Sequence, residues 1–205
     1  MSTSLPRLHA ITDERIARRS DLDDIARALA VGGGADLAFH ARGRQLSGRE
    51  HYDLAVRLSV SQSVRLFVND RLDVALAVPA AGVQLGRGSL SVSAARALNP
   101  RWWIGRSVHD LAEAEAARTE GADYVVVGPV YATASHPGRP PLGPERLHAI
   151  VIAMGDLPVI AIGGITADRI GTVRKAGAYG FAAIRAFWDD AEPAEAARRM
   201  REWMS

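Results

Sequence analysis

Hydroxyl and imidazole groups gather in the segment that follows the apolar run ending near residue 127. Thr133, Ser135 and His136 lie there between Pro129 and Pro137. Hydroxyl groups donate hydrogen bonds to anions, and an imidazole with an unperturbed pKa of about 6.5 can exchange a proton at neutral pH. Thr133 and Ser135 are therefore predicted to bind a substrate, and His136 is predicted to transfer a proton. An exposed loop position for His136 is the alternative.

A second group of such residues ends another apolar run. His40, Arg42 and Arg44 alternate along the chain. In an extended segment alternate side chains share one face, so all three could point toward one ligand. Cationic groups on one face suit an anionic substrate, and His40 is a second candidate for proton transfer. For the two arginines a solvated surface position is the alternative.

Polar residues also end the next three apolar runs. Asn69 and Asp70 could contact a ligand or hold Mg²⁺. They could equally cap the helix expected from residue 71. Gln84 and Ser107 follow as further candidates for substrate binding. His109 could cap the next helix or touch the substrate.

A pair of glycines marks a candidate phosphate site. Gly163 and Gly164 allow backbone N–H groups to approach a ligand closely, and Thr166 could cap the helix that follows. A helix N-terminus attracts anions, and Arg185 near the end of the last apolar run could add a charge-assisted hydrogen bond. A tight glycine turn without a ligand is the alternative.

Eight apolar runs alternate with eight helical patterns along the chain. The runs cover residues 8–11, 36–40, 65–68, 82–85, 102–105, 123–127, 158–162 and 181–184. The helical patterns lie near 21–31, 48–61, 71–78, 91–98, 109–120, 144–154, 167–176 and 191–203. Runs that are apolar throughout are typical of parallel strands covered on both faces.

Eight strand–helix units predict a closed barrel. The rival, an open sheet that binds a dinucleotide, calls for a G-x-G-x-x-G turn after the first strand, whereas this chain has ITDERI at 11–16. We therefore predict an α/β fold, a single (β/α)₈ TIM barrel over residues 1–205. In such barrels the chemistry lies on the loops after the strands, which is where the candidate residues stand.

Composition narrows the classes of function. The 205 residues are 48% hydrophobic and carry a formal net charge of +2, which does not suggest a nucleic-acid partner. The absence of cysteine excludes disulfides and thiolate chemistry. No secretory signal and no run of about 18 apolar residues is found, so we predict a cytoplasmic protein with no membrane partner. A homodimer is allowed; Trp102, Trp103, Phe187 and Trp188 could form an interface, but we favour the core.

Seven segments resemble, in order, those of one family. They are LHAITD (8–13), NDRLDVA (69–75), GVQLG (82–86), IGRSVHD (104–110), GADYVVVGPVYAT (121–133), PVIAIGGIT (158–166) and GAYGFAAIR (177–185). Over nearly its whole length the chain resembles the thiamine phosphate synthase and thiazole tautomerase superfamily of (β/α)₈ barrels. The resemblance implies a phosphorylated thiazole as the small-molecule partner.

The synthase branch joins hydroxymethylpyrimidine diphosphate to thiazole phosphate and expels diphosphate with Mg²⁺. Its pattern implies Gln at 40, Arg at 42, Lys at 44, Asn-Asp at 69–70, a second Asp at 88 and Thr-x-Thr-Lys over 133–136. Matches and conservative changes are Arg42, Arg44, Asn69, Asp70, Thr133 and Ser135. His40, Gly88 and His136 depart from the pattern, and Gly88 would leave Asp70 alone to hold the metal.

The tautomerase branch moves a proton on a thiazole carboxylate phosphate and needs no cofactor. VQLGRGSLS (83–91), GRSVHDLAEA (105–114) and His40 resemble this branch, but Pro129 stands where its catalytic histidine belongs. We predict an isomerase of the tautomerase type in thiamine biosynthesis, with His136 and His40 as the acid and base. A Mg²⁺-dependent synthase is the first alternative, and a non-catalytic binder of thiazole or thiamine phosphates is the second.

Overall fold

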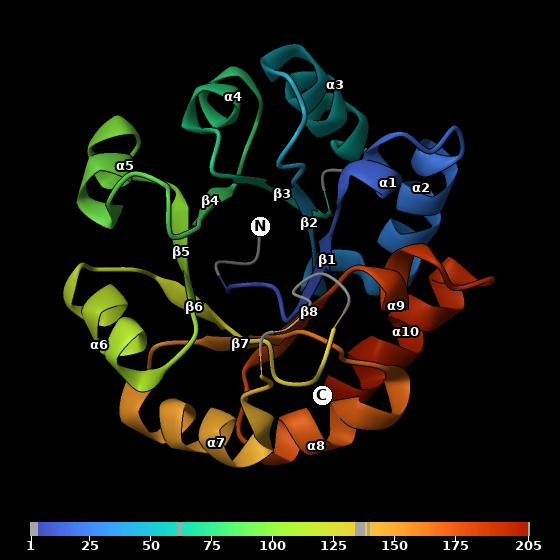
Figure 1. The fold of residues 1–205 in the computed structure, drawn as a ribbon. Helices are drawn as coiled ribbons and strands as arrows, with labels where there is room; N and C mark the ends of the chain where they lie inside the picture. The colour runs from blue at the N-terminus through green and yellow to red at the C-terminus, as the bar shows by residue number, and fades with distance from the viewer. Residues whose placement is uncertain (1–3, 61–62, 134–137, 139, 205) are drawn as a thin grey trace.

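Eight parallel strands close into a barrel. The computed structural model describes residues 4–60, 63–133, 138 and 140–204. The strands are β1 (Leu8–Ile11), β2 (Leu37–Ala41), β3 (Arg65–Asn69), β4 (Gly82–Leu85), β5 (Trp103–Val108), β6 (Tyr124–Val127), β7 (Val159–Ile162) and β8 (Gly180–Ala183). Each strand pairs with the next along the chain, and β8 pairs with β1 to complete the ring (Figure 1). The predicted (β/α)₈ barrel is confirmed.

Helices surround the strands on the outside of the ring (Figure 1). One longer helix follows each strand: α2 (Leu22–Gly33), α3 (Gly48–Leu58), α4 (Leu72–Ala77), α5 (Val92–Leu98), α6 (Leu111–Thr119), α7 (Gly143–Met154), α8 (Ile170–Lys175) and α10 (Pro193–Met204). The sequence did not predict three shorter elements: α1 (Glu14–Ala17), α9 (Arg185–Trp188) and the 3₁₀ turn η1 (Gly34–Asp36). Three or four residues are too few to show a helical period. The 3₁₀ turn η2 (Ala167–Arg169) forms the start of the helical pattern predicted near 167–176.

Local sequence signals explain where the helices begin. At α3 the Ser47 hydroxyl accepts a hydrogen bond from the Glu50 N–H, and the Glu50 carboxylate accepts one from the Ser47 N–H at 2.8 Å. This capping box satisfies two N–H groups that the first turn would otherwise leave unpaired. Side-chain caps also begin α5 at Ser91 and α6 at Asp110, so these loops become helices at defined residues.

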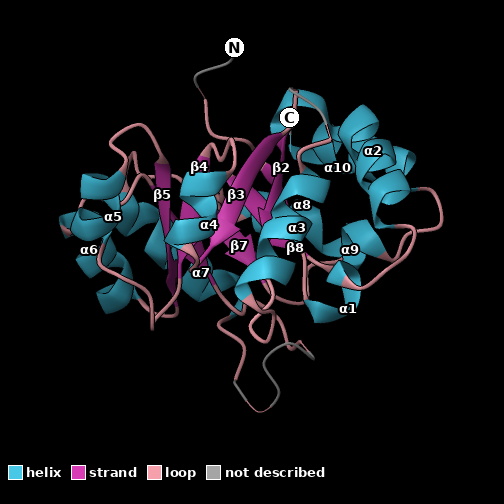
Figure 2. Cartoon of the chain, turned by 90° about the horizontal axis from the view of Figure 1, so that it is seen from above, coloured by secondary structure: helices cyan, strands magenta, loops and turns pink. Residues whose placement is uncertain are grey.

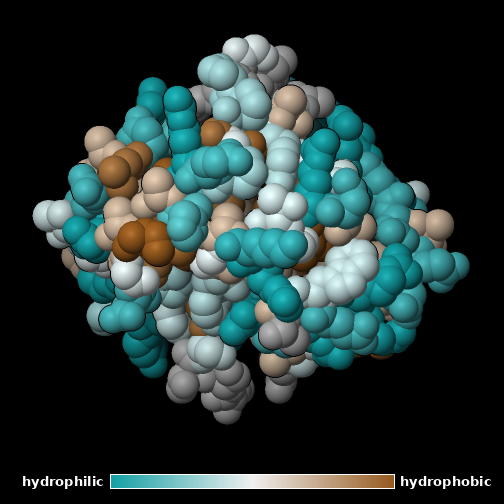
Figure 3. Space-filling view, turned by 90° about the horizontal axis from the view of Figure 1, so that it is seen from below, coloured by the Kyte–Doolittle hydropathy of each residue, from teal (hydrophilic) through white to brown (hydrophobic). Residues whose placement is uncertain are grey.

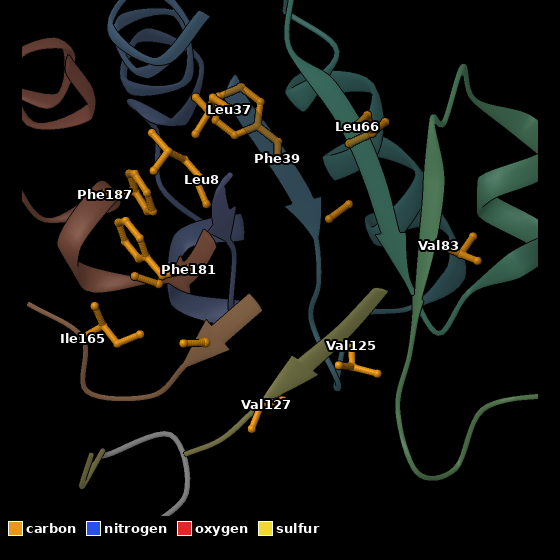
Figure 4. Close-up of a cluster of buried hydrophobic side chains, with 14 of the residues drawn as sticks. Leu8, Leu37, Phe39, Leu66, Val83, Val125, Val127, Ile165, Phe181 and Phe187 are labelled. Atoms are coloured by element: carbon orange, nitrogen blue, oxygen red, sulfur yellow. The ribbon is translucent and has the colours of Figure 1, made fainter. Parts of the chain in front are cut away.

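Alternate residues of each strand face the helices and form the outer hydrophobic core. Figure 4 shows Leu8, Leu37, Phe39, Leu66 and Phe181 among these side chains. The rings of Phe181 and Phe187 are stacked, with centroids 5.7 Å apart. Because the strands are parallel and covered on both faces, the remaining alternate residues must point to the barrel axis.

Residues that face the barrel axis form a core of their own. A second hydrophobic cluster contains Leu5, Ile11, Ala38, Phe67, Tyr124, Val126, Ile160 and Ala182. Leu5 precedes β1, and the Arg7 guanidinium donates a hydrogen bond to the Met204 carbonyl at 2.9 Å, so both ends of the chain lie where the strands begin (Figure 2). The opposite mouth, at the carboxyl ends of the strands, remains available for a ligand.

Strand β5 is longer than the sequence predicted. It continues past Gly105 to Val108, and Ser107 pairs with Val126 of β6. The apolar pattern stops at Gly105 because Arg106 and Ser107 are polar, although the backbone remains in the sheet. The Ser107 hydroxyl accepts a hydrogen bond from Gln84 Nε2 at 2.9 Å, which brings two predicted site residues together inside the mouth.

The aromatic residues named in the sequence lie in the interior. Trp102, Phe187 and Trp188 are buried, and Trp103 packs partly buried against the inner cluster. Exposed large apolar side chains occur on separate helices, among them Val31 on α2 and Ile152 on α7. The face over α7 and α8 is largely hydrophilic, with scattered apolar groups (Figure 3). A homodimer therefore remains a prediction. In the described part of the chain, no helix is both long and apolar enough to cross a membrane.

Candidate functional site

A cavity of about 560 Å³ opens at the carboxyl ends of the strands. Its described walls come from the loops after β2 to β8. The predicted site residues that line it are Arg42, Arg44, Asn69, Asp70, Gln84, Ser107, Thr133, Gly163, Gly164 and Arg185. The structure thus gathers at one cavity residues from the ends of seven strands, β2 to β8, or from the segments that follow them, while their roles toward a ligand remain predictions.

The charge of the cavity is strongly positive. Arginines 42, 44, 87, 169 and 185 line it, and Asp70 is the one carboxylate among its described lining residues. Some of these cations lie on the β2–β4 side and others on the β7–β8 side, and β3 and β7 are on opposite sides of the ring (Figure 1). Such a lining suits a ligand, or a pair of ligands, with anionic groups at both ends.

Arg42 is held at the wall by its backbone. Its N–H donates to the Thr12 hydroxyl at 2.9 Å, and that hydroxyl contacts the His40 and Arg42 carbonyls at 3.0 and 2.9 Å. Burial lowers the pKa of the Arg42 guanidinium from its ordinary value, and the nearby charge of Arg44 lowers this pKa further. A bound anion would offset both effects, so this side of the cavity favours anion binding.

Asp70 occupies a conformation that is rare for a residue with a side chain. Its φ is 61°, and its Oδ1 accepts hydrogen bonds from the Gly86 N–H at 2.8 Å and from the Ser89 hydroxyl. Arg71, rather than Asn69 or Asp70, is the N-cap of α4, so the capping alternative is wrong. The loop after β4 therefore holds Asp70 at the cavity.

Asp70 could bind a magnesium ion whose other ligands are mainly substrate phosphate oxygens and water. The described hydrogen bonds of its carboxylate are made by Oδ1, so Oδ2 is not used by Gly86 or Ser89. Within the described residues, no three of His, Cys, Asp and Glu gather into a metal site. Mg²⁺ commonly takes one or two carboxylates together with substrate phosphates, so a single carboxylate is sufficient. A Cβ on Gly88 would meet no atom within 4 Å, and no described side chain replaces the second Asp there.

The glycine pair after β7 packs against the loop after β6. Gly163 and Gly164 have φ of 102° and 61°, which L side chains rarely adopt. A Cβ on Gly163 would lie 2.6 Å from Pro129 Cβ, and one on Gly164 would lie 2.5 Å from the Ala132 carbonyl oxygen. Only glycine allows the two loops to approach this closely while both line the cavity.

The residues beside the glycine pair do not form the capped helix that the sequence predicted. A 3₁₀ turn follows Thr166, and the Thr166 hydroxyl donates to Asp168 Oδ1 at 2.7 Å instead of capping a helix. A long helix dipole is therefore not present at this point. Arg185 lines the cavity as the first residue of α9, and Arg169 adds a second guanidinium.

Sequence reasoning missed Arg169. Its Nη1 donates to the Gly164 carbonyl at 2.7 Å, and its guanidinium lies over the Tyr131 ring at 4.5 Å. These contacts tie the two loops together and leave a cation at the cavity. Its place soon after the strand β7 was the available signal, because loops after strands 7 and 8 often bind phosphate in such barrels.

His109 lines the cavity. The sequence allowed it either to cap the next helix or to contact the substrate. Asp110 is the N-cap of α6, accepting a hydrogen bond from the Glu113 N–H. The His109 Nδ1 is 2.6 Å from the Gly128 carbonyl oxygen, which only accepts, so Nδ1 carries the hydrogen. In the neutral ring the other nitrogen, Nε2, is then an acceptor.

His40 does not lie at the cavity wall, which corrects the expectation that it exchanges a proton with a substrate. Its side chain is fully buried inside the barrel, and its ring is stacked on Phe67 with centroids 5.0 Å apart. Burial, followed by the charge of His9, holds the pKa of His40 well below its usual value. The sequence suggested a shared face with Arg42 and Arg44, but β2 ends at Ala41, so the period of two does not continue.

Gln84 and Thr133 complete the predicted residues at the cavity. Gln84 is buried, and its Oε1 and the Tyr124 hydroxyl are buried without a described hydrogen-bond partner. Thr133 lines the cavity. The predicted Ser135 and His136 lie outside the described residues.

Comparison with known proteins identifies related chains. The family model described as "Thiamine monophosphate synthase" matches residues 8–187. A thiamine-phosphate synthase of Methanoculleus marisnigri is 42% identical over 200 residues, covering 95% of this chain and 93% of that protein. The one of Salinispora tropica is 42% identical over 205 residues, covering 98% of both. A thiamine phosphate pyrophosphorylase structure from Pyrococcus furiosus superposes with a TM-score of 0.83 at 32% identity, covering 97% and 95% of the two chains.

Proposed function

Because the chain belongs to the thiamine monophosphate synthase family and is an enzyme of thiamine biosynthesis, we propose that it is a transferase that makes thiamine phosphate. It joins hydroxymethylpyrimidine diphosphate to a thiazole phosphate and releases diphosphate. The observation that carries this proposal is one cavity with five arginines and one carboxylate among its described lining residues. The curated relatives at 42% identity carry the synthase name, which supports the same choice.

The proposed reaction needs charge stabilisation more than proton transfer. The bond from the pyrimidine methylene carbon to the diphosphate oxygen breaks, and its electron pair leaves with the diphosphate. The thiazole ring nitrogen forms the new bond to that carbon with its own electron pair, and it carries no hydrogen to lose. Arg42, Arg44 and Asp70 on the β2–β3 side suit the departing diphosphate, and the glycine pair with Arg185 suits the thiazole phosphate.

In the proposed reaction, Asp70 would bind the magnesium ion. Asp70 would hold the ion through the oxygen not used by Gly86 and Ser89. When bound, Mg²⁺ neutralises charge on a diphosphate leaving group. The arginines around Asp70 supply the remaining positive charge from the chain itself.

The tautomerase prediction has less support. Its proposed base His40 is buried behind the wall, and Pro129 lines the cavity where that branch has a histidine. His136 lies outside the described residues and lends it no geometric support. The relatives reported above carry the synthase name, which was our alternative.

An assay with both substrates tests the proposed function. Purified protein with Mg²⁺, hydroxymethylpyrimidine diphosphate and thiazole phosphate is expected to release one diphosphate for each thiamine phosphate formed. A parallel assay supplies the thiazole carboxylate phosphate tautomer alone. Conversion of that tautomer without diphosphate release from the first mixture would overturn the proposal. Tight calorimetric binding of thiamine phosphate with no turnover in either assay would also overturn it and favour a binder.

Two arginine variants should show which substrate binds at each end of the cavity. Arg42→Met is expected to raise KM for the pyrimidine diphosphate by about 10- to 100-fold, because a charge-assisted contact is lost. Arg185→Met should raise KM for the thiazole phosphate by a similar factor. Each variant should leave the other KM nearly unchanged, as measured by initial rates at saturating co-substrate. Arg49→Met is the control, because Arg49 is 83% exposed on α3 and pairs with Asp53. Equal effects of both variants on both constants would contradict the assignment of the ends.

A further inference from the structure

A chain of three hydrogen bonds runs through the barrel interior to the cavity. His9 Nε2 lies 2.9 Å from the Pro6 carbonyl oxygen, and His9 Nδ1 lies 2.8 Å from His40 Nε2. His40 Nδ1 lies 3.0 Å from the atom assigned as the Asn69 oxygen, Oδ1. Both histidines are fully buried, while Asn69 is 6% exposed and lines the cavity.

The number of available hydrogen atoms determines which atom donates in each of these three hydrogen bonds. Three contacts need three hydrogens, and two neutral imidazoles supply two. The Pro6 carbonyl can only accept, so His9 Nε2 carries a hydrogen and His9 Nδ1 accepts. His40 Nε2 must then carry the second hydrogen, and His40 Nδ1 accepts. The third hydrogen can come only from the amide N–H₂ of Asn69.

The opposite arrangement would place a net charge in the barrel. As assigned, the Asn69 oxygen faces His40 Nδ1, and three hydrogen bonds would then need a second hydrogen on one of the two imidazoles. No carboxylate takes part in the described contacts of either ring. An unpaired buried charge is strongly unfavourable, and burial lowers the pKa of His9 to about 4. Both rings are therefore neutral, each with its hydrogen on Nε2.

The other end of the Asn69 amide faces the cavity. Among the described residues, the buried side-chain atoms without a partner are Gln84 Oε1, Tyr124 OH and Trp188 Nε1, and none belongs to Asn69. The second terminal atom of Asn69 makes no described hydrogen bond, so it is exposed at the cavity. Exchanging the amide nitrogen and oxygen leaves the shape of the side chain unchanged. With nitrogen toward His40, oxygen is the atom that a ligand meets.

We propose that the buried His9–His40 pair is a positioning device that makes Asn69 present its carbonyl oxygen to the cavity, where it binds an N–H donor of the substrate ring. An amide oxygen would repel a phosphate oxygen, so this position excludes the diphosphate. Asn69 ends β3 and lies deeper than the exposed Asp70, which places the ring inside and the diphosphate at the rim. This reading of the substrate rests on the proposed function, whereas the orientation of the amide does not.

Nuclear magnetic resonance of ¹⁵N-histidine-labelled protein tests the orientation directly. Long-range ¹H–¹⁵N spectra distinguish a neutral ring with hydrogen on Nε2 from one with hydrogen on Nδ1 and from a cation. His9 and His40 are each expected to show the neutral Nε2–H form at pH 7, and His148→Gln assists the assignment. A His40 ring with hydrogen on Nδ1, or a cationic ring in either residue, would overturn the proposal whatever reaction the enzyme performs.

Kinetics of a buried variant test the consequence for the substrate. His40→Phe keeps an aromatic ring beside Phe67 but removes the acceptor for the Asn69 amide. KM for the pyrimidine diphosphate is expected to rise about tenfold, with kcat and the KM for thiazole phosphate changed less than about twofold. His148→Phe on α7 is the control. An unchanged KM in a folded His40→Phe protein would overturn the role in substrate recognition. If His40→Phe does not fold, the spectra of the unaltered protein still determine the orientation of the Asn69 amide.

Discussion

Replacement of Asp70 by Asn is expected to lower kcat for thiamine phosphate formation by about 10²- to 10³-fold, the usual effect of removing one group that stabilises charge in the transition state. Asp70 is the one carboxylate on the described cavity wall. Asn keeps the oxygen that accepts from Gly86 and Ser89, and it tolerates the φ of 61°. The change in unfolding free energy should therefore stay below about 1 kcal/mol.

The control for this variant is Asp73→Asn, three residues further along. Asp73 is exposed on α4, pairs with Arg71 and does not line the cavity. Initial rates measured across a Mg²⁺ titration should show a higher half-saturating Mg²⁺ concentration for Asp70→Asn alone. A kcat equal to that of the unaltered enzyme at low Mg²⁺ would show that Asp70 takes no part in binding the ion.

The barrel could be predicted because its signals are local and repeated. Apolar runs such as Val159–Ile162 have no polar alternation, which is typical of strands covered on both faces. Eight such runs between helical patterns leave few topologies. Errors occurred where a strand carries polar residues inward, as at Ser107 in β5, because the hydropathy pattern then ends before the backbone pairing does.

The site was predictable in its location but not in the burial of its histidines. Arg42, Asp70 and Gly163 line the cavity because the loops after parallel strands meet at one mouth. The sequence does not reveal that His40 contacts His9, which lies 31 positions earlier, since only the register of β1 and β2 brings their rings together. A histidine next to arginines in sequence can thus belong to the interior of the barrel. The same limit applied to Arg169, whose role depends on the fold of two loops.

Replacement of Gly164 by Ala should weaken the phosphate end of the cavity. A Cβ there would lie 2.5 Å from the Ala132 oxygen and 2.8 Å from Tyr131 Cβ, so the loops after β6 and β7 must separate. Strain at a φ of 61° and the displaced backbone N–H groups should raise KM for thiazole phosphate by about 10- to 100-fold. Unfolding free energy should fall by about 1–3 kcal/mol, measured by urea denaturation.

Gly171→Ala is the matched control for Gly164→Ala. Gly171 lies in α8, a Cβ there would meet no atom within 4 Å, and its φ is not in the left-handed region. The control should stabilise the protein by about 0.5–1 kcal/mol, because alanine favours a helix interior, and it should leave both KM values unchanged. The comparison separates folding from binding. If Gly164→Ala destabilises the protein but keeps the KM for thiazole phosphate, the glycine pair serves only the packing of the loops, and the phosphate must bind nearer to Arg169 and Arg185.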